Sequence, residues 1–402
     1  MGGAVAAPRR RRRSWPRRLG FLIGLLLLLA LGLELGARAL FPSPFSAEGD
    51  LVGMYENAEE QGSVRTVPGW EGEFTVEGRT VPVRLDRLGL RSPEIGPRQP
   101  DELRVLCLGD SFVFGYGVAG EEAFPALLQG LLAQQLGRPV VTGNAGVPGY
   151  GTVEQARCLR RVAAAFDPDV VVSTIYLGND FVDDQQRAKY VEGGYCMGGD
   201  WAALLRRSAR ARFMLRSRAW MKLELALIEA GSPWALQPVP PPDEEAAFAG
   251  FPPRNRPNQC VAGLFMDVID PQRSWDAAQP LPVVPRVLDK VRESLSAMRA
   301  TAGRAPVLVV LMPSWWHVSE PDRMALLKKV RLDPAEYRLG LTQQRLEELC
   351  ASMSLPVVDL TPRFTEHGDP DHWFLQADRH LNAEGHRFVA ETVAPAIEAL
   401  LR

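Results

Sequence analysis

A short apolar run that ends in Gly109-Asp110-Ser111 constrains the fold of this chain more than any other feature. The run at 104–108 is typical of a fully buried strand in a parallel sheet, and an amphipathic stretch follows at 124–136. A strand, a glycine turn and a helix in this order put Ser111 at the carboxyl edge of a sheet, where open α/β sheets bind ligands. The alternative is a simple helix cap, because Asp and Ser are common capping residues.

Three further polar blocks follow strand-like runs or turns. They are Asn144-Ala145-Gly146-Val147-Pro148-Gly149, Gly178-Asn179-Asp180 and Asp378-Arg379-His380-Leu381-Asn382. Apolar runs precede them at 140–142, 170–177 and 355–360. Because parallel strands end at one edge of their sheet, we expect these blocks to gather around Ser111.

In this order the blocks resemble those of the SGNH, or GDSL-type, esterase and acyltransferase superfamily. The resemblance covers residues 102–180 and 285–402, and rests on Ser111, Asn144 to Gly149, Asn179 and His380. It implies a three-layer, flavodoxin-like α/β fold with a parallel five-stranded sheet. It also implies an ester hydrolase that requires no metal and no organic cofactor.

The chemistry of acyl transfer points to the same residues. A serine hydroxyl becomes a good nucleophile when a base accepts its proton, and His380 is the imidazole expected to do so. The reaction also develops an oxyanion, which needs preorganised donors. By resemblance, these donors are the backbone N–H groups of Ser111 and Gly149 and the side-chain amide of Asn179. A glycine at 149 lets the backbone approach a substrate without an intervening side chain.

The spacing of the acid departs from the family pattern. The family usually has an aspartate three residues before the histidine, but Ala377 holds that place and Asp378 lies two before His380. We expect Asp378 to orient the His380 ring as the third member of a Ser-His-Asp triad. The alternative is that Asp378 only forms the turn leading into a helix capped by Asn382.

An aromatic group follows the strand predicted at 305–312. Trp315, Trp316 and His317 are a candidate acyl or sugar pocket at the same sheet edge. The alternative is that the two tryptophans cover the core.

The remaining histidines do not form a recognisable metal site. His367 and His372 flank an acidic loop, but they lack the helical or CxxC spacing of metal ligands. His386 is expected to be a partly buried residue of the last helix. The sequence therefore predicts no metal.

The N-terminus combines a basic arm with an apolar segment. Residues 1–18 contain seven arginines and no acid, and residues 19–41 are uncharged apart from Glu34 and Arg38, which can pair on one helix. A helix of that length spans about 35 Å, enough to cross a bilayer. The positive-inside rule then keeps the arm in the cytoplasm, and the catalytic domain is periplasmic or on the cell surface. The alternative is secretion after cleavage of a signal peptide near 37–39.

Length and composition favour one catalytic domain with additions. With 402 residues, 46% hydrophobic and 23% charged, the chain can bury a large core. We expect this domain at 102–402, with an insertion at 181–285. The residues after the arm have a net charge of −9, which argues against a nucleic-acid partner.

The insertion has two dissimilar halves. The first, at 201–230, is basic and helical in pattern, and the second is rich in proline. The helical half is expected either to cap the active site or to lie on anionic lipid headgroups. Cys196 and Cys260 both lie in the insertion, and an oxidising compartment would allow them to form a disulfide.

A connector at 42–101 precedes the core. Residues 73–76 and 80–83 alternate like a hairpin around Glu77-Gly78-Arg79. In the core, strands and helices alternate, which predicts a parallel sheet covered on both faces. The expected strands are 104–109, 139–144, 169–177, 305–312 and 355–360, and the expected helices are 122–136, 152–165, 286–302, 340–353 and 383–400.

These patterns favour a membrane-anchored serine esterase that acts on acyl esters, with a glycan or a lipid as the candidate substrate. An O-acyltransferase that modifies cell-surface glycans would use the same serine. A phospholipase is a further alternative, because the basic insertion would lie near the bilayer. The rival from another class is a non-catalytic glycan-binding module, but binding alone would not require Ser111, Gly149, Asn179 and His380 together.

Overall fold

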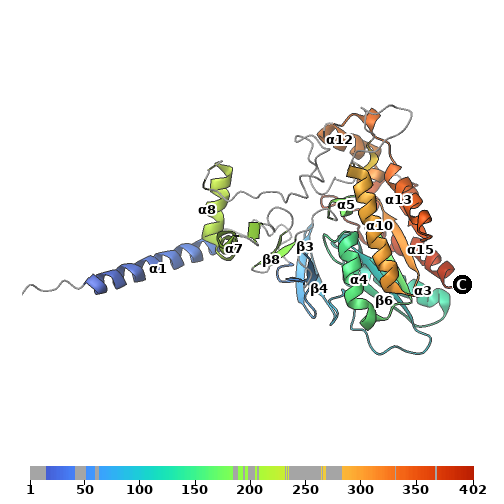
Figure 1. Cartoon of the computed structure of the whole chain (residues 1–402), viewed down its shortest axis with the longest axis horizontal. Coiled ribbons are helices and arrows are strands. Elements are labelled where there is room, and N and C mark those ends of the chain that lie inside the picture. The colour runs from blue at the N-terminus through green and yellow to red at the C-terminus, as the bar shows by residue number, and fades with distance from the viewer. Residues whose placement is uncertain are drawn as a thin grey trace, which may run out of the picture. The chain divides into compact units, whose positions relative to one another are not determined.

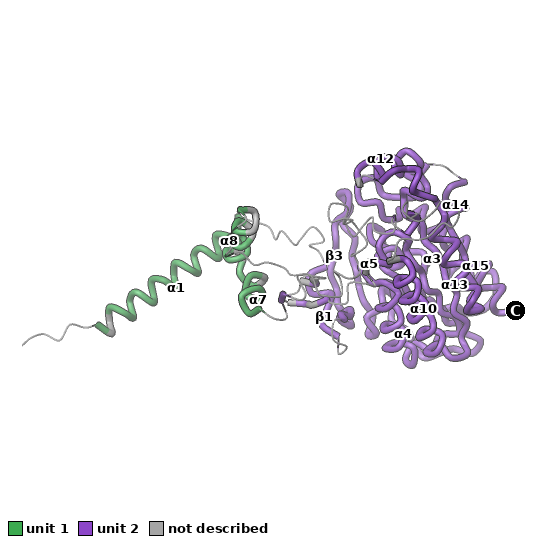
Figure 2. Tube along the Cα trace, turned by 45° about the horizontal axis from the view of Figure 1, so that its top comes forward, with its two compact units in different colours: residues 1–47, 208–237 green, residues 48–207, 238–402 purple. Residues whose placement is uncertain are grey.

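The structure is a computed structural model of the chain. It describes residues 15–40, 51–58, 63–183, 189–192, 195–197, 204–205, 208–230, 232, 234, 264, 266–268, 283–330, 332–366 and 369–402. The chain divides into two compact units, residues 1–47 with 208–237 and residues 48–207 with 238–402 (Figure 2).

A parallel sheet of five strands forms the centre of the second unit, as the sequence predicts. Its strand order is β11-β10-β7-β5-β6, and all neighbours pair in parallel. Every residue of β5, β7 and β10 is buried, which explains why their sequences are mostly apolar. The strands are β5 (Leu103–Gly109), β6 (Val140–Gly146), β7 (Val170–Tyr176), β10 (Val307–Met312) and β11 (Val357–Asp359).

Helices cover both faces of this sheet and make the fold three-layered. One apolar cluster joins the sheet to α4, α10 and α13, and a second joins it to α3 and α15. Figure 1 shows α4 and α10 side by side along one face. These helices are α3 (Phe124–Leu136), α4 (Thr152–Phe166), α10 (Val283–Ala302), α13 (Leu341–Ser352) and α15 (Ala383–Leu400).

Shorter elements connect the layers. Among them, α12 is a mixed polar and apolar helix that was not predicted from the sequence. The connecting helices are α2 (Ser111–Phe114), α5 (Asp180–Asp183), α11 (Trp315–Val318), α12 (Glu320–Val330) and α14 (Thr361–Thr365), with 3₁₀ turns at Gly120–Glu122, Pro334–Glu336 and Pro370–His372. Short antiparallel pairs are formed by β1 (Tyr55–Asn57) with β2 (Val64–Thr66) and by β8 (Tyr190–Glu192) with β9 (Tyr195–Met197).

The connector of the second unit contains a regular hairpin. Strands β3 (Glu71–Val76) and β4 (Arg79–Arg84) pair antiparallel around Glu77 and Gly78, where the sequence places a hairpin. The inward side chains of this hairpin form a small core with Phe114 and Tyr116, which follow the Ser111 turn. The connector therefore packs directly against the segment after Ser111.

The first unit consists of α1 (Trp15–Leu40), α7 (Ala209–Arg216) and α8 (Arg218–Glu229). Within the described residues, α1 alone is long and apolar enough to cross a membrane, from Arg18 to Leu40. Glu34 on α1 accepts hydrogen bonds from Ser217 Oγ at 2.8 Å and from Arg38 at 2.6 Å. The two charges of the apolar segment thus pair with each other, and Glu34 also holds the junction between α7 and α8.

Candidate active site

Ser111 is the first residue of α2, immediately after β5. The Asp110 side chain caps this short helix by accepting a hydrogen bond from Phe112 N at 2.9 Å. Gly115 ends it in a left-handed conformation, with φ at 85°. The cap and the glycine fix both ends of the turn, and Ser111 remains half-buried at the edge of the sheet.

His380 reaches Ser111 from the far end of the chain. Its Nε2 atom lies 2.7 Å from Ser111 Oγ. The His380 carbonyl accepts a hydrogen bond from Leu375 N at 2.8 Å, so the loop that carries the ring is closed on itself. Phe112 and Tyr116 flank the imidazole, each with a centroid separation of 4.9 Å. The structure therefore brings the expected base within hydrogen-bonding reach of the expected nucleophile.

Asp378 is the carboxylate that contacts the other ring nitrogen. Its Oδ1 atom hydrogen-bonds to His380 Nδ1. Arg379, between the two residues, has a φ of 68°. This left-handed residue turns the chain so that a carboxylate only two positions away faces the ring. Burial alone would raise the pKa of Asp378, but the hydrogen bond to His380 and the charge of that ring outweigh it, and the pKa of Asp378 is lowered.

Asp110 is a second carboxylate beside the nucleophile, in a different environment. It is buried, and burial raises its pKa to about 6. Its Oδ2 atom is 3.4 Å from Ser111 Oγ, and its Oδ1 atom accepts from Phe112 N. The carboxylate hydrogen-bonded to His380 is Asp378, so Asp110 acts as the cap of α2.

The Gly149 block lies beside the Ser111 turn. Gly109 and Gly146 are register partners on β5 and β6, and Val147 N donates to the Gly109 carbonyl at 3.0 Å. Gly149 has a φ of 75°, a conformation that favours glycine, and its carbonyl accepts a hydrogen bond from Lys189 Nζ. This block thus extends past the carboxyl end of β6, the neighbour of β5.

Asn179 follows the other neighbour of β5. It is half-buried and lies between the end of β7 and the start of α5. Asp180, the next residue, accepts a hydrogen bond from Tyr176 N at 2.9 Å and so closes the turn after β7. All four predicted blocks are therefore found at or just beyond the carboxyl ends of strands, or in the loop of His380.

Arg91 supports the Ser111 turn from the connector, a role that was not predicted from the sequence. Its buried guanidinium donates to the carbonyl oxygens of Phe114, Gly115 and Val118 at 2.7–2.9 Å. Burial lowers the pKa of Arg91 to about 10. In the sequence, Arg91 simply follows the turn-like segment Leu88-Gly89-Leu90. Such a local pattern does not indicate that the arginine side chain contacts backbone carbonyls elsewhere in the fold.

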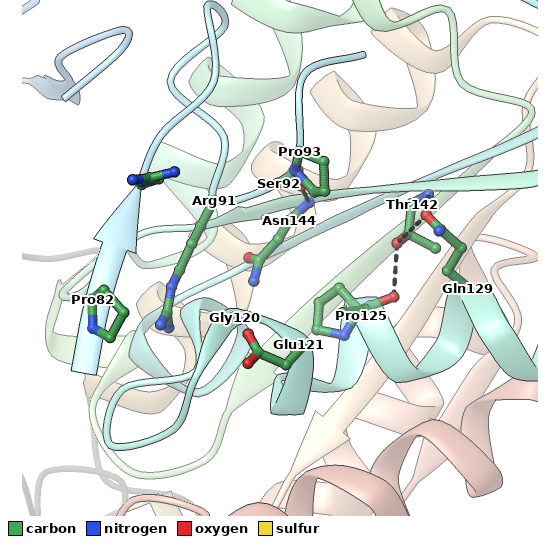
Figure 3. A pocket seen from close by; sticks show the side chains of 12 residues that line it. Pro82, Arg91, Ser92, Pro93, Gly120, Glu121, Pro125, Gln129, Thr142 and Asn144 are labelled. Atoms are coloured by element: carbon green, nitrogen blue, oxygen red, sulfur yellow. Dashed lines mark hydrogen bonds between the residues drawn. The ribbon is translucent and has the colours of Figure 1, made fainter. Parts of the chain in front are cut away.

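A hollow of about 510 Å³ lies next to this arginine. Figure 3 shows Arg91, Ser92 and Asn144 on its wall. Ser111 and His380 are not among its lining residues. The hollow is therefore distinct from the place where Ser111 and His380 meet.

Two of the three expected pocket residues are in the core. Trp316 and His317 are 0% and 1% exposed, so the expectation that they line a substrate pocket is wrong. The reason is local, because α11 turns the chain inward and Ser314 N donates to His317 Nδ1 at 3.1 Å. Trp315 is partly buried and lies beneath the Arg379 guanidinium at 5.5 Å.

His386 is also fully buried, rather than partly as expected. Phe124 N donates to its Nδ1 atom at 3.3 Å, and burial lowers its pKa to about 3. His372 is exposed in a 3₁₀ turn. Cys260 and His367 lie outside the described residues, so the disulfide from Cys196 to Cys260 stays a prediction.

Comparison with known proteins gives a family match and a set of distant structural similarities. Residues 107–388 match the GDSL-like Lipase/Acylhydrolase family. Among solved structures, a lipase/acylhydrolase from Enterococcus faecalis is 14% identical, with 74% of this chain and 96% of that chain covered and a TM-score of 0.38.

Two other solved structures are comparably distant. TesA is 15% identical, with 74% and 99% covered and a TM-score of 0.37. LAE5, an alpha/beta hydrolase from the metagenome of Lake Arreo, Spain, is 15% identical, with 74% and 96% covered and a TM-score of 0.38. No curated protein matches the chain. At these TM-scores the structural similarities carry no argument about function.

Proposed function

Because the chain belongs to the GDSL-like lipase/acylhydrolase family, whose members are ester hydrolases, we propose that it is a serine esterase that acts outside the cytoplasm. The observation that carries the proposal is the 2.7 Å contact between Ser111 Oγ and His380 Nε2. A base at this distance can accept the hydroxyl proton as the oxygen attacks an ester carbonyl.

The proposed reaction has two halves. In the first, Ser111 Oγ attacks the carbonyl carbon, His380 takes the hydroxyl proton, and the tetrahedral intermediate expels the alcohol as His380 returns the proton to it. In the second, His380 removes a proton from water, the resulting hydroxide attacks the acyl-serine, and Ser111 leaves with the proton from His380. Asp378 holds the ring and stabilises the imidazolium that forms in each half.

The oxyanion needs donors on the side of the carbonyl away from His380. The proposed donors are the N–H groups of Ser111 and Gly149 and the side-chain amide of Asn179. Ser111 N belongs to the first turn of a helix, where backbone N–H groups have no intrahelical acceptor. The location of the other two residues beyond β6 and β7, on either side of β5, supports this assignment.

A serine-directed fluorophosphonate tests the nucleophile directly. We expect the probe to label the purified full-length protein at one site, and we expect Ser111→Ala to abolish both the labelling and the hydrolysis of p-nitrophenyl acetate. Ser296→Ala, on the exposed face of α10, is the matched control and should keep both. Labelling that persists in Ser111→Ala would exclude the proposed mechanism.

The acceptor of the acyl group is tested in the same assay. If water is the acceptor, free acid accumulates at the same rate with and without added glycan. An O-acyltransferase would instead form acylated glycan at the expense of the free acid. The same Ser111 chemistry underlies both products, so the ratio of acid to acylated glycan decides between them.

We also propose that α1 is a retained membrane anchor. Glu34 accepts from Ser217 Oγ and from Ala219 N, and Arg38 donates to the Arg216 carbonyl at 2.9 Å. Cleavage between Ala37 and Ala39 or just after them would separate Glu34 from these partners, which supports retention. N-terminal sequencing of the mature protein from membranes tests this, because a chain that starts near residue 40 would show a cleaved signal.

A further inference from the structure

The turn of the β3–β4 hairpin carries a residue that its backbone does not favour. Val76 pairs with Arg79, so Glu77 and Gly78 alone form the turn. Their φ angles are 49° and 80°, which matches a type I′ turn, where Asn-Gly or Asp-Gly is preferred. A glutamate in the left-handed region is uncommon and costs free energy. Its side chain therefore requires an explanation other than the turn itself.

The Glu77 carboxylate contacts the loop that carries Asp378. Its Oε1 atom accepts hydrogen bonds from Ala377 N at 2.5 Å and from Asp378 N at 3.2 Å. The side chain of Asp378 starts from this same backbone and hydrogen-bonds to His380 Nδ1. The hydrogen bonds to these two N–H groups therefore hold the backbone of Asp378, and this backbone position determines where its carboxylate meets the His380 ring.

The hairpin also contacts the segment that follows Ser111. Phe74 on β3 stacks on Tyr116 with a centroid separation of 4.7 Å, and Tyr116 lies 4.9 Å from the His380 ring. Arg79 on β4 forms an ion pair with Glu122 at 2.7 Å. The hairpin thus contacts both the segment after Ser111 and the loop before His380.

We propose that Glu77 is a positioning residue that holds the Asp378 backbone so that its carboxylate faces His380. The inference rests on the proposed function of Ser111 and His380. The Asp378 side chain is 30% exposed, so water competes for its carboxylate when the loop is loose. The bonds from Glu77 are themselves exposed and add little to global stability, so their loss should lower the rate of the chemical step rather than unfold the protein.

Three substitutions separate this role from a structural one. Glu77→Ala removes the acceptor and should lower kcat about 10- to 100-fold with KM within about twofold, because a misplaced catalytic group affects the transition state. Glu77→Gln keeps an oxygen acceptor and should rescue most of kcat. Glu77→Asn suits the turn but is one methylene shorter, so it should keep or raise Tm while kcat falls. Glu73→Ala, an exposed carboxylate on β3, is the control for charge and should match wild type.

The measurements use detergent-solubilised full-length protein and p-nitrophenyl acetate. Wild-type kcat in Glu77→Ala would overturn the inference, as would a loss of kcat and Tm together in Glu77→Asn. An equal loss of kcat in Glu77→Gln and Glu77→Ala would also overturn it, because charge rather than an acceptor would then matter.

A failure of the proposed function gives a different result. In that case wild-type protein would show no turnover, or turnover that survives Ser111→Ala. The role of Glu77 is then tested by proton NMR of the hydrogen bond between His380 Nδ1 and Asp378, assigned by its loss in His380→Asn. We expect this signal in wild type and Glu77→Gln but not in Glu77→Ala, and its persistence in Glu77→Ala would refute the positioning role.

Discussion

Ser111 Oγ and His380 Nε2 lie 2.7 Å apart although 269 positions separate the two residues in the chain. Two features of the fold create this contact. The helix cap at Asp110 aims the hydroxyl out of the sheet edge, and the bridge between Phe374 and Leu381 returns the last loop to that edge. The pair is therefore held by the core on one side and by a closed loop on the other.

Asp378 should contribute to catalysis through the His380 ring. Asp378→Asn keeps the size of the side chain but removes the charge that orients the ring and stabilises the imidazolium. We expect kcat for p-nitrophenyl acetate to fall by about 10² to 10⁴, with little change in KM. Asp369→Asn, at an exposed position in the preceding turn, is the control. A kcat within a factor of about two of wild type in Asp378→Asn would remove this residue from the mechanism.

Asn179 should matter for the transition state and little for substrate binding. Asn179→Ala removes one proposed oxyanion donor, so kcat should fall by about 10² to 10³. Fluorophosphonate labelling of Ser111 should slow as well, because the phosphonyl oxygen uses the same donors. Gln344→Ala, at an exposed position on α13, serves as the control. Unchanged kcat with raised KM would instead assign Asn179 to substrate binding.

The sequence predicted the centre of the sheet closely because its central strands are buried on both faces. A strand such as β10 has an uninterrupted apolar sequence, and its observed limits, Val307–Met312, lie within the expected 305–312. The helix capped by Asn382 was predictable for a similar reason, because the cap is local, and Asn382 Oδ1 accepts from Gly385 N at 3.0 Å. Local rules were sufficient at these positions.

The contacts that support the site were not predictable from local patterns. Glu77 accepts hydrogen bonds from backbone N–H groups about 300 positions away, and Arg91 donates to backbone carbonyls of the turn after Ser111. A glutamate or an arginine in a sequence does not by itself indicate such a partner. Trp316 and His317 show the opposite error, since they follow a strand that ends at the active edge, yet α11 turns them into the core. Tertiary packing decides such cases, because a large aromatic side chain gains free energy by burial.

Asp110 should make stability depend on pH. Its pKa is raised to about 6 by burial, so the folded protein binds this proton more tightly than the unfolded chain, where the ordinary value is 3.8. The stabilisation is complete below pH 3.8 and is lost as the pH rises to about 6. Above that pH the ionised carboxylate costs up to about 3 kcal/mol relative to a neutral group.

Asp110→Asn tests this dependence, because asparagine keeps the capping oxygen without the charge. We expect the Tm of the variant relative to wild type to increase by several degrees between pH 4 and pH 7, measured by calorimetry. Asp289→Asn, at an exposed position on α10, should show no such trend. A Tm difference that is constant with pH would contradict a raised pKa at Asp110.

Arg91 should stabilise the fold and the Ser111 turn together. Arg91→Met removes the guanidinium donor from the carbonyl oxygens of Phe114, Gly115 and Val118, so the free energy of unfolding should fall by about 2–4 kcal/mol. Arg84→Met is a matched control, because Arg84 lines the same hollow but its side chain is 79% exposed, and its loss should cost less than about 0.5 kcal/mol. Urea unfolding measures both values. Two of the three carbonyls lie at the end of the helix that begins at Ser111, so kcat should fall in Arg91→Met even where the protein remains folded. Equal stability of Arg91→Met and Arg84→Met would contradict the prediction, because it would show that water replaces the guanidinium.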